Sequence, residues 1–247
     1  MTRYLRLEVK RAILSGGFVV GLSLATAAGV LGMVPEIRLA PGAGALYLFR
    51  SFYSSSIALL APILATIPFS QSFAVERNSG FLRSIMQRMS ERRYAAVRLA
   101  STALAGGLVL AIPVAGALAW VTASYPVVAD PNGDPHVFGR MLTVSPIAFM
   151  WIAVGTAFLF GATFAIAGLA SSTLFRNPYY ANVVPLVLYV VPAFFLGMLG
   201  LGFLDPPMMW EPSNHVATTP LSVASQYGLW LIASLVVFFR FLRLKEE

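Results

Sequence analysis

Apolar residues gather in six long runs along the chain, separated by shorter segments that carry nearly all of the charge. The runs are Ala12–Val34, Ile57–Val75, Val97–Ala123, Ile147–Leu174, Tyr180–Leu204 and Leu221–Leu242. A helix that crosses the hydrocarbon core of a bilayer needs about 20 largely apolar residues, and each run supplies such a length. We therefore predict an all-α polytopic membrane protein with six transmembrane helices, which form a single transmembrane domain over residues 1–247.

The fifth run is the least regular of the six. Pro192 interrupts it, and the stretch from Gly197 to Gly202 is rich in glycine, which disfavours a helix. Apolar backbone that is not helical is tolerated at membrane depth only where protein or a water-filled cavity covers it. We therefore expect a re-entrant segment of short helices within Pro192–Pro220, between the fifth and sixth spans.

The composition also indicates lipid as the solvent. Of the 247 residues, 58% are hydrophobic and 11% charged, and the mean hydropathy is +0.77. Soluble domains carry about 45–50% apolar and about 25% charged residues. The net charge of +7 does not predict nucleic-acid binding, because the basic residues lie between apolar runs rather than on one soluble face. The absence of cysteine excludes disulfides and thiol chemistry.

The basic residues predict how the six spans are oriented. If the spans alternate in direction, 14 of the 17 Lys and Arg residues fall on the side that holds both termini. The others are Arg38, Arg50 and Arg140. The positive-inside rule places the basic side in the cytoplasm. We therefore expect a multi-pass protein of the cell (inner) membrane with both termini cytoplasmic, and outer loops centred near Ala40, Asp134 and Glu211.

The most informative segment, Glu76–Ser90, follows the second run. On a helical wheel five of its apolar side chains share an arc of about 140°, and arginine, serine and glutamine fill the rest. These apolar residues are Phe81, Leu82, Ile85, Met86 and Met89. We expect a short cytoplasmic amphipathic helix with Ser79 as its N-cap. Such a helix either rests on lipid headgroups or presents its apolar face to a cytoplasmic partner.

A weaker pattern of the same kind precedes the first span. Arg3, Arg6 and Lys10 share one helical arc, and apolar residues share the opposite arc. This pattern predicts an N-terminal interfacial helix that its three basic residues anchor to the membrane surface. A solvated basic end of the chain is the alternative.

Neither ATP hydrolysis nor another catalytic reaction is indicated by the sequence. A P-loop requires the pattern G-x-x-x-x-G-K-(S/T), and the only lysines, Lys10 and Lys245, lie in no such context. His136 and His215 both fall in predicted outer loops, no G-x-S-x-G elbow is present, and two scattered histidines do not make a metal site. We therefore expect no enzymatic activity, and no metal or cofactor held by this chain.

Ionisable residues are nearly absent from the six runs, whereas a proton- or sodium-coupled carrier keeps one near the midplane. The second and fifth runs instead each have a face that mixes polar and aromatic residues. These residues include Thr66, Phe69, Ser70 and Phe73 in the second run, and Asn182 and Tyr189 in the fifth. Such faces either line a substrate path or pack helices together, because small and hydroxyl residues are enriched between membrane helices.

Glu76, Arg77, Gly80 and Ile85 match a degenerate pattern, roughly Glu-Arg-x-x-Gly-(Ser/Thr)-x-x-x-(Leu/Ile), in which Phe81 replaces a small hydroxyl residue. With this pattern, the chain resembles the permease subunits of type-2 ATP-binding-cassette exporters (type V exporters).

Two further features agree with this resemblance. Arg98 is similar to a basic residue that often enters the third span of the family. A Pro-Pro-aromatic loop followed by Pro-Leu-(Ser/Thr) often precedes its last span. The matching residues here are Pro206, Pro207, Trp210, Pro220, Leu221 and Ser222.

The resemblance implies a permease subunit that forms the export path for an apolar or amphipathic substrate: lipid-linked, drug-like or a peptide. It implies a separate cytoplasmic ATP-binding-cassette ATPase that holds ATP and Mg, and a dimer with a second permease copy or a paralogue. The ATPase-coupling residues would be Glu76, Gly80, Phe81, Arg83, Ile85 and Met86. Phe175–Tyr179 would form a smaller second contact, and Glu76 would pair with Arg98, with Arg77 or with the partner.

Membrane lipids are expected around the chain, and no nucleic acid is expected to bind it. The alternative function is that of a non-transport six-helix membrane scaffold, such as an assembly or immunity factor. A neighbouring gene for a P-loop ATPase without membrane spans favours the exporter, and its absence favours the scaffold.

Overall fold

The computed structural model describes residues 2–40, 42–130, 137–201, 204–214 and 218–243, and within these ranges every regular element is helical. Five helices are long and apolar enough to cross a membrane. They are α2 (Gly16–Leu39), α7 (Glu91–Ser124), α9 (Pro146–Leu174), α10 (Tyr180–Met198) and α12 (Pro220–Arg243). A sixth span results if α3 (Ala45–Tyr53) and α4 (Ser56–Thr66), bent by 53° at their junction, are counted as one. The chain is thus an all-helical, multi-pass membrane protein with five to six candidate spans.

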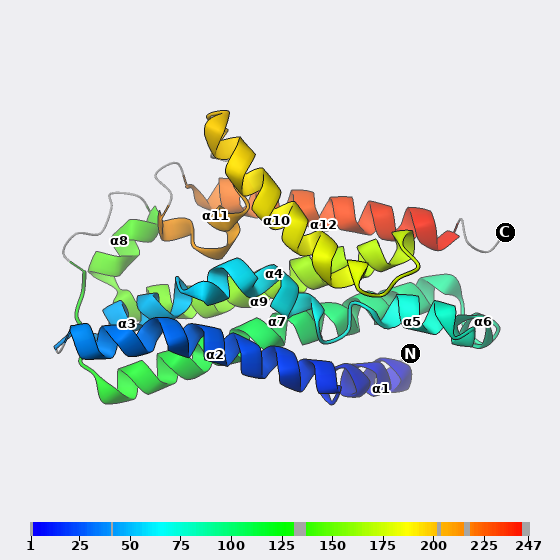
Figure 1. Cartoon of the computed structure of the whole chain (residues 1–247), viewed down its shortest axis with the longest axis horizontal. Helices are drawn as coiled ribbons and strands as arrows, with labels where there is room; N and C mark the ends of the chain where they lie inside the picture. Colours follow the sequence, from blue (N-terminus) through cyan, green and yellow to red (C-terminus); the bar gives the residue numbers. More distant parts are fainter. Residues whose placement is uncertain (1, 41, 131–136, 202–203, 215–217, 244–247) are drawn as a thin grey trace.

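Helices α2, α7, α9 and α12 run roughly along the longest axis of the molecule, and α10 crosses them obliquely (Figure 1). At one end lie α1 (Thr2–Ile13), α5 (Ser72–Asn78), α6 (Phe81–Met86) and the end of α12. At the opposite end lie α3 and α8 (Val137–Val144). We call these the α6 end and the α8 end. Three elements at the α8 end, α2, α3 and α8, contain Arg38, Arg50 and Arg140, as the alternation of the spans predicted.

Small residues allow α7 and α9 to approach each other closely. A Cβ atom on Gly106 would lie 2.8 Å from the carbonyl oxygen of Gly161, and one on Gly161 would lie 2.3 Å from that of Gly106. Helices in membranes associate through such small residues, because their backbones then come into direct van der Waals contact. This contact forms the centre of the bundle, against which the other spans pack.

The second span differs from the single helix expected over Ile57–Val75. Helix α4 ends at Thr66, residues 67–71 form a turn, and α5 begins only at Ser72. Pro68 lies in this turn and has no amide hydrogen to donate to a helical ladder. The predicted outer loop before the second span is also wrong in part, because α3 lies within it and buries most of its side chains.

The fifth span ends earlier than the expected Leu204. Helix α10 continues through Pro192 and stops at Met198, and Gly200 follows with a φ of +70°. The expected re-entrant segment contains a short helix, α11 (Pro207–Trp210), and a 3-10 turn, Pro212–Asn214. Within the predicted segment, residues 202–203 and 215–217 lie outside the described residues.

Trp210 holds α11 in the bundle. Its indole Nε1 donates a hydrogen bond to the carbonyl oxygen of Tyr53 (3.0 Å), and the Tyr53 hydroxyl donates to the carbonyl oxygen of Trp210. The two rings stack with their centroids 4.7 Å apart, and Phe160 of α9 packs edge-on against Trp210. The segment between α10 and α12 therefore folds inward onto α3 and α9.

Candidate functional site

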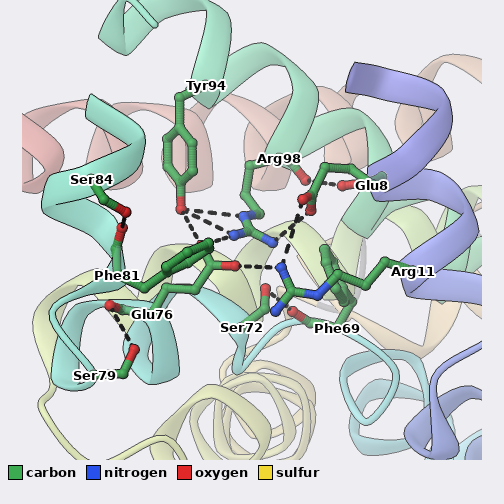
Figure 2. Close-up of polar contacts among 11 residues, drawn as sticks. Glu8, Arg11, Phe69, Ser72, Glu76, Ser79, Phe81, Ser84, Tyr94 and Arg98 are labelled. Atoms are coloured by element: carbon green, nitrogen blue, oxygen red, sulfur yellow. Dashed lines mark hydrogen bonds and ion pairs between the residues drawn. The ribbon is translucent and has the colours of Figure 1, made fainter. Parts of the chain in front are cut away.

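A cluster of charged side chains joins three helices at the α6 end (Figure 2). Glu8 and Arg11 are one turn apart on α1, Glu76 lies near the end of α5, and Tyr94 and Arg98 are one turn apart on α7. Residues three and four positions apart on a helix project to the same side. Each of α1 and α7 therefore presents a pair of polar groups to the same cluster, in which Arg11, Tyr94 and Arg98 contact Glu76. We call these five residues the ion network.

Arg98 is the central cation of the ion network, and its side chain is 1% exposed. Its Nη1 lies 3.1 Å from Glu8 Oε2, its Nη2 donates to Glu76 Oε2, and its Nε donates to the Tyr94 hydroxyl at 3.3 Å. The guanidinium also lies over the rings of Phe69 and Tyr94, 4.9 Å and 5.2 Å from their centroids. A planar guanidinium can form several hydrogen bonds and stack on aromatic rings at once, which an ammonium cannot.

Glu76 is the central anion, and its side chain is 3% exposed. Its Oε1 accepts a hydrogen bond from Arg11 at 2.7 Å, and its Oε2 accepts from Arg98 and from the Tyr94 hydroxyl, the latter at 3.0 Å. Burial would by itself raise the pKa of Glu76, but the Arg98 charge and these hydrogen bonds outweigh it and lower the pKa below its ordinary value. Glu76 is therefore an inward-facing carboxylate.

Arg77 points away from the ion network and contacts the loop between α9 and α10. Its guanidinium donates to the carbonyl oxygens of Thr173 (3.2 Å) and Phe175, and Asn78 donates to that of Arg176 (2.9 Å). Burial and the neighbouring Arg176 charge lower the pKa of Arg77. The two cytoplasmic segments predicted from the sequence, the one after the second span and Phe175–Tyr179, thus lie against each other.

Gly80 lets the chain turn from α5 into α6. Its φ is +74°, a conformation that glycine adopts without the steric cost of a Cβ atom, and it follows the C-cap residue Ser79 of α5. The prediction that Ser79 is the N-cap of the amphipathic helix is wrong. Ser79 ends α5 and its hydroxyl donates to the Glu76 carbonyl oxygen at 3.1 Å, whereas Gly80 is the N-cap residue of α6. The helix is also shorter than expected and ends at Met86.

The apolar face of α6 is covered mainly by this chain. Leu82, Ile85, Met86 and Met89 are half-buried and pack against an apolar cluster at the α6 end. The cluster contains Phe73, Tyr94, Ala95, Leu169, Ala170, Phe238 and Leu242. Of the five apolar residues predicted to share this face, Phe81 alone is exposed, at 53%, and Arg83 is also exposed. An intramolecular cover for this face was not among the expected alternatives.

The predicted N-terminal helix is present as α1, and part of it packs against the bundle. Arg6 and Lys10 are exposed, and the side chain of Arg3 lies outside the described residues. Glu8 and Ala12 are buried against the bundle. The sequence reasoning missed Glu8 and Arg11 as site residues. Their i, i+3 spacing is the only local signal, and it does not name a partner on another helix.

The residues proposed to line a substrate path are packed against protein. Thr66, Phe69, Ser70, Phe73 and Tyr189 are buried. The Ser70 hydroxyl donates to the carbonyl oxygen of Ala165 (2.9 Å), and Tyr189 packs edge-on against two phenylalanines of α9, Phe160 and Phe164.

The second and fifth spans nevertheless meet at one point on α9. A Cβ atom on Gly168 would lie 2.5 Å from the Ala181 carbonyl oxygen, 2.7 Å from Thr66 and 3.0 Å from Ser70. Asn182 follows Ala181, and its buried amide oxygen has no hydrogen-bond partner among the described residues. The two polar faces predicted from the sequence are therefore adjacent.

Among the described residues, no group of three or more His, Cys, Asp or Glu side chains is placed to hold a metal ion. No protein-family model, curated protein or solved structure matches the chain.

Proposed function

We propose that this chain is the membrane-spanning permease subunit of an ATP-binding-cassette exporter. It would act as a dimer with a second copy or a paralogue, in the cell membrane and with both termini cytoplasmic. A separate cytoplasmic ATPase would hold ATP and Mg and drive the transport of an apolar or amphipathic substrate. The observation that carries the proposal is a continuous set of contacts that begins at α6. The apolar cluster connects α6 to α5 and α7, and the ion network connects these two helices to α1.

Tyr94 links these two groups of residues. Its ring belongs to the apolar cluster that supports Ile85 and Met86 of α6, and its hydroxyl donates to Glu76. A displacement of α6 would therefore act on α5 and α7 together, and through Arg98 and Glu8 on α1. Energetic coupling over such distances is carried by packed side chains and hydrogen-bonded networks between rigid elements.

The docking surface for the ATPase would centre on the exposed Phe81, and Arg83 would lie at its edge. Phe175, Arg176 and Tyr179, from the loop that Arg77 and Asn78 hold in place, are exposed beside the α5 segment. Exposed aromatic and arginine side chains are the residue types that dominate the binding energy of protein interfaces. Glu76 and Gly80 would act from inside, Glu76 by joining the helices and Gly80 by setting the direction of α6.

The substrate path would involve the contact of the second and fifth spans at Gly168. Thr66 and Ser70 lie there beside Ala181, and the unpartnered amide oxygen of Asn182 is a polar group that a bound substrate would satisfy. A change in the packing of α4 and α10 against α9 would open this region. Ion coupling is not required, since the energy would come from the partner.

Partner binding by Phe81 variants tests the proposal. The ATPase that co-purifies with the chain is titrated against wild type, Phe81→Ala and Arg83→Ala after equal membrane insertion is verified. Truncation of a central interface side chain costs about 2 kcal/mol or more, so Phe81→Ala should weaken binding on the order of thirtyfold and lower ATPase stimulation. Arg83→Ala should have a smaller effect.

Phe194→Ala provides the control, because it truncates another exposed phenylalanine, on α10, which is 73% exposed against 53% for Phe81. It should leave ATPase binding unchanged. Ile85→Ala is a poor probe of docking, since Ile85 is half-buried against the chain itself and its loss should lower stability. If Phe81→Ala keeps full partner binding and full transport, α6 is a lipid-resting or structural helix and the coupling proposal is wrong.

ATP hydrolysis by the chain alone provides a second test. The purified chain, free of other polypeptides, should have no ATPase activity, because neither lysine lies in a P-loop. Hydrolysis by the isolated chain would contradict the division of roles between permease and ATPase.

A further inference from the structure

An apolar groove of about 540 Å³ runs between α2 and α7, away from the ion network. Its floor includes Phe52 of α3, and its walls include Val30 and Ile37 of α2 and Gly116 and Trp120 of α7. Both wall helices are candidate membrane spans. The groove therefore lies at a depth where the surrounding solvent is hydrocarbon.

Two glycines shape this groove. A Cβ atom on Gly29 would lie 2.3 Å from the ring of Phe52, so the absence of a side chain lets that ring pack directly against α2 and form the floor. A Cβ atom on Gly116 would meet no atom within 4 Å, so the missing side chain leaves open space in the wall. The groove is thus formed by the packing of three helices and is more than a gap between long side chains.

The length and lining of the groove fit a hydrocarbon chain. On α2 the lining residues extend from Leu22 to Ile37, which is about 22 Å of helix, so the groove runs along the membrane spans. Its lining is apolar apart from Thr26 and the indole nitrogen of Trp120. An extended acyl chain that lies parallel to the spans matches this groove in length and in polarity.

A cation stands at one end of the groove. Arg38 follows the lining residue Ile37 in the last turn of α2, is exposed, and forms no ion pair with a carboxylate of the described residues. The neighbouring Glu36 instead accepts a hydrogen bond from the Tyr47 hydroxyl at 2.6 Å. Trp120 lines the groove near the same end of α7, and tryptophan is enriched at the level of lipid headgroups. Arg38 is thus placed to bind the phosphate of a lipid whose chain enters the groove.

We infer that the groove between α2 and α7 binds one acyl chain of a membrane phospholipid and that Arg38 holds the phosphate of the same molecule. If α1 faces the cytoplasm, this phospholipid belongs to the outer leaflet. The inference goes beyond the proposed function, because such a site would exist in an exporter and in a scaffold alike. The bound lipid would fill the space between α2 and α7 and join them.

Filling the groove tests this inference. Wild type, Gly116→Phe, Gly155→Phe and Arg38→Gln are reconstituted in phosphatidylcholine vesicles that contain a phosphatidylcholine with a photoreactive acyl chain. Labelled peptides are mapped by mass spectrometry, and retained phospholipid is measured after prolonged detergent exchange. Gly155 on α9 is the matched control, because a Cβ atom there also meets nothing within 4 Å and Gly155 does not line the groove.

Wild type and Gly155→Phe should retain a phospholipid and be labelled on α2 and α7. Gly116→Phe should lose that labelling and retention by about tenfold or more, and Arg38→Gln should release the lipid about tenfold faster. Equal labelling of Gly116→Phe and Gly155→Phe, or the absence of retained phospholipid in wild type, would show ordinary surrounding lipid only and overturn the assignment. Unchanged release from Arg38→Gln would overturn the role of Arg38.

Discussion

The carboxylate of Glu76 and the guanidinium of Arg98 form an ion pair in which both side chains are almost fully removed from water. The two residues are 22 positions apart, on either side of α6. Glu8 and Arg11 complete the pair from α1, so two carboxylates and two guanidiniums balance within one cluster. Desolvation of charges is costly, and the hydrogen bonds of this cluster are what offset it.

We predict that the loss of Arg98 is partly rescued by the loss of Glu76. Arg98→Met leaves the buried Glu76 carboxylate with Arg11 and the Tyr94 hydroxyl and should destabilise the protein by about 3–5 kcal/mol. The double variant Glu76→Gln/Arg98→Met leaves Glu8 and Arg11, which form a neutral pair at 3.6 Å. Thermal unfolding in detergent should therefore show the double variant to be more stable than the sum of the two single losses predicts.

Arg88→Met is the control for these Glu76 and Arg98 variants. Because Arg88 is exposed, its loss should change the midpoint of thermal unfolding little. Strictly additive losses in the double variant would mean that Glu76 and Arg98 are not energetically coupled.

The lowered pKa of Glu76 predicts how acid acts on the fold. Because the folded-state pKa is below the unfolded value of about 4.3, the contribution of Glu76 is fully present at higher pH. It is lost as the pH falls through the folded-state pKa. The unfolding midpoint should thus respond to Glu76 only below about pH 4, and the Glu76→Gln/Arg98→Met variant should lack this part of the acid response. A loss of the wild-type contribution already at pH 6 would contradict the direction of the shift.

Two glycines of α9 should respond in opposite ways to the same substitution. Gly168→Ala places a Cβ atom 2.5 Å from the Ala181 carbonyl oxygen and should cost about 1–3 kcal/mol, because backbone must move. Gly155→Ala meets no neighbour and should be neutral or stabilise by up to about 1 kcal/mol through helix propensity. Unfolding midpoints compare the two, and equal effects would mean that α9 and α10 do not meet at Gly168.

The topology can be tested with single cysteines, since the natural chain has none. Val144 is exposed at the α8 end and Gln87 is exposed just after α6. In intact cells an impermeant thiol reagent should label Val144→Cys, and it should label Gln87→Cys only after the inner face is opened. The reverse pattern would invert the orientation. Glu211, the expected centre of a third outer loop, is buried and is therefore unsuitable for labelling.

Local sequence patterns determined the parts of this fold that depend on transfer into lipid. Apolar runs of sufficient length predicted the long helices, because hydrocarbon requires every backbone group to be paired within the helix. The division of basic residues predicted which helix ends lie together. The same patterns failed over Ala45–Tyr53, where Arg50 shortens the apolar run although the helix is buried. They also joined α4 and α5 across Pro68, because hydropathy alone does not register a lost backbone hydrogen bond.

The amphipathic segment after Glu76 shows what only the tertiary structure decided. Its sequence determined that Phe81, Ile85 and Met86 share a face, since that follows from the helical period. Whether lipid, a partner or the chain itself covers that face depends on where α5, α7 and α12 come together, and no local period contains that information. The same holds for Glu76, for which the sequence offered Arg77, Arg98 or a partner. Packing brought Arg98 and Arg11 to it and turned Arg77 toward Phe175, because burial of a charge is stable only where distant residues supply its partners.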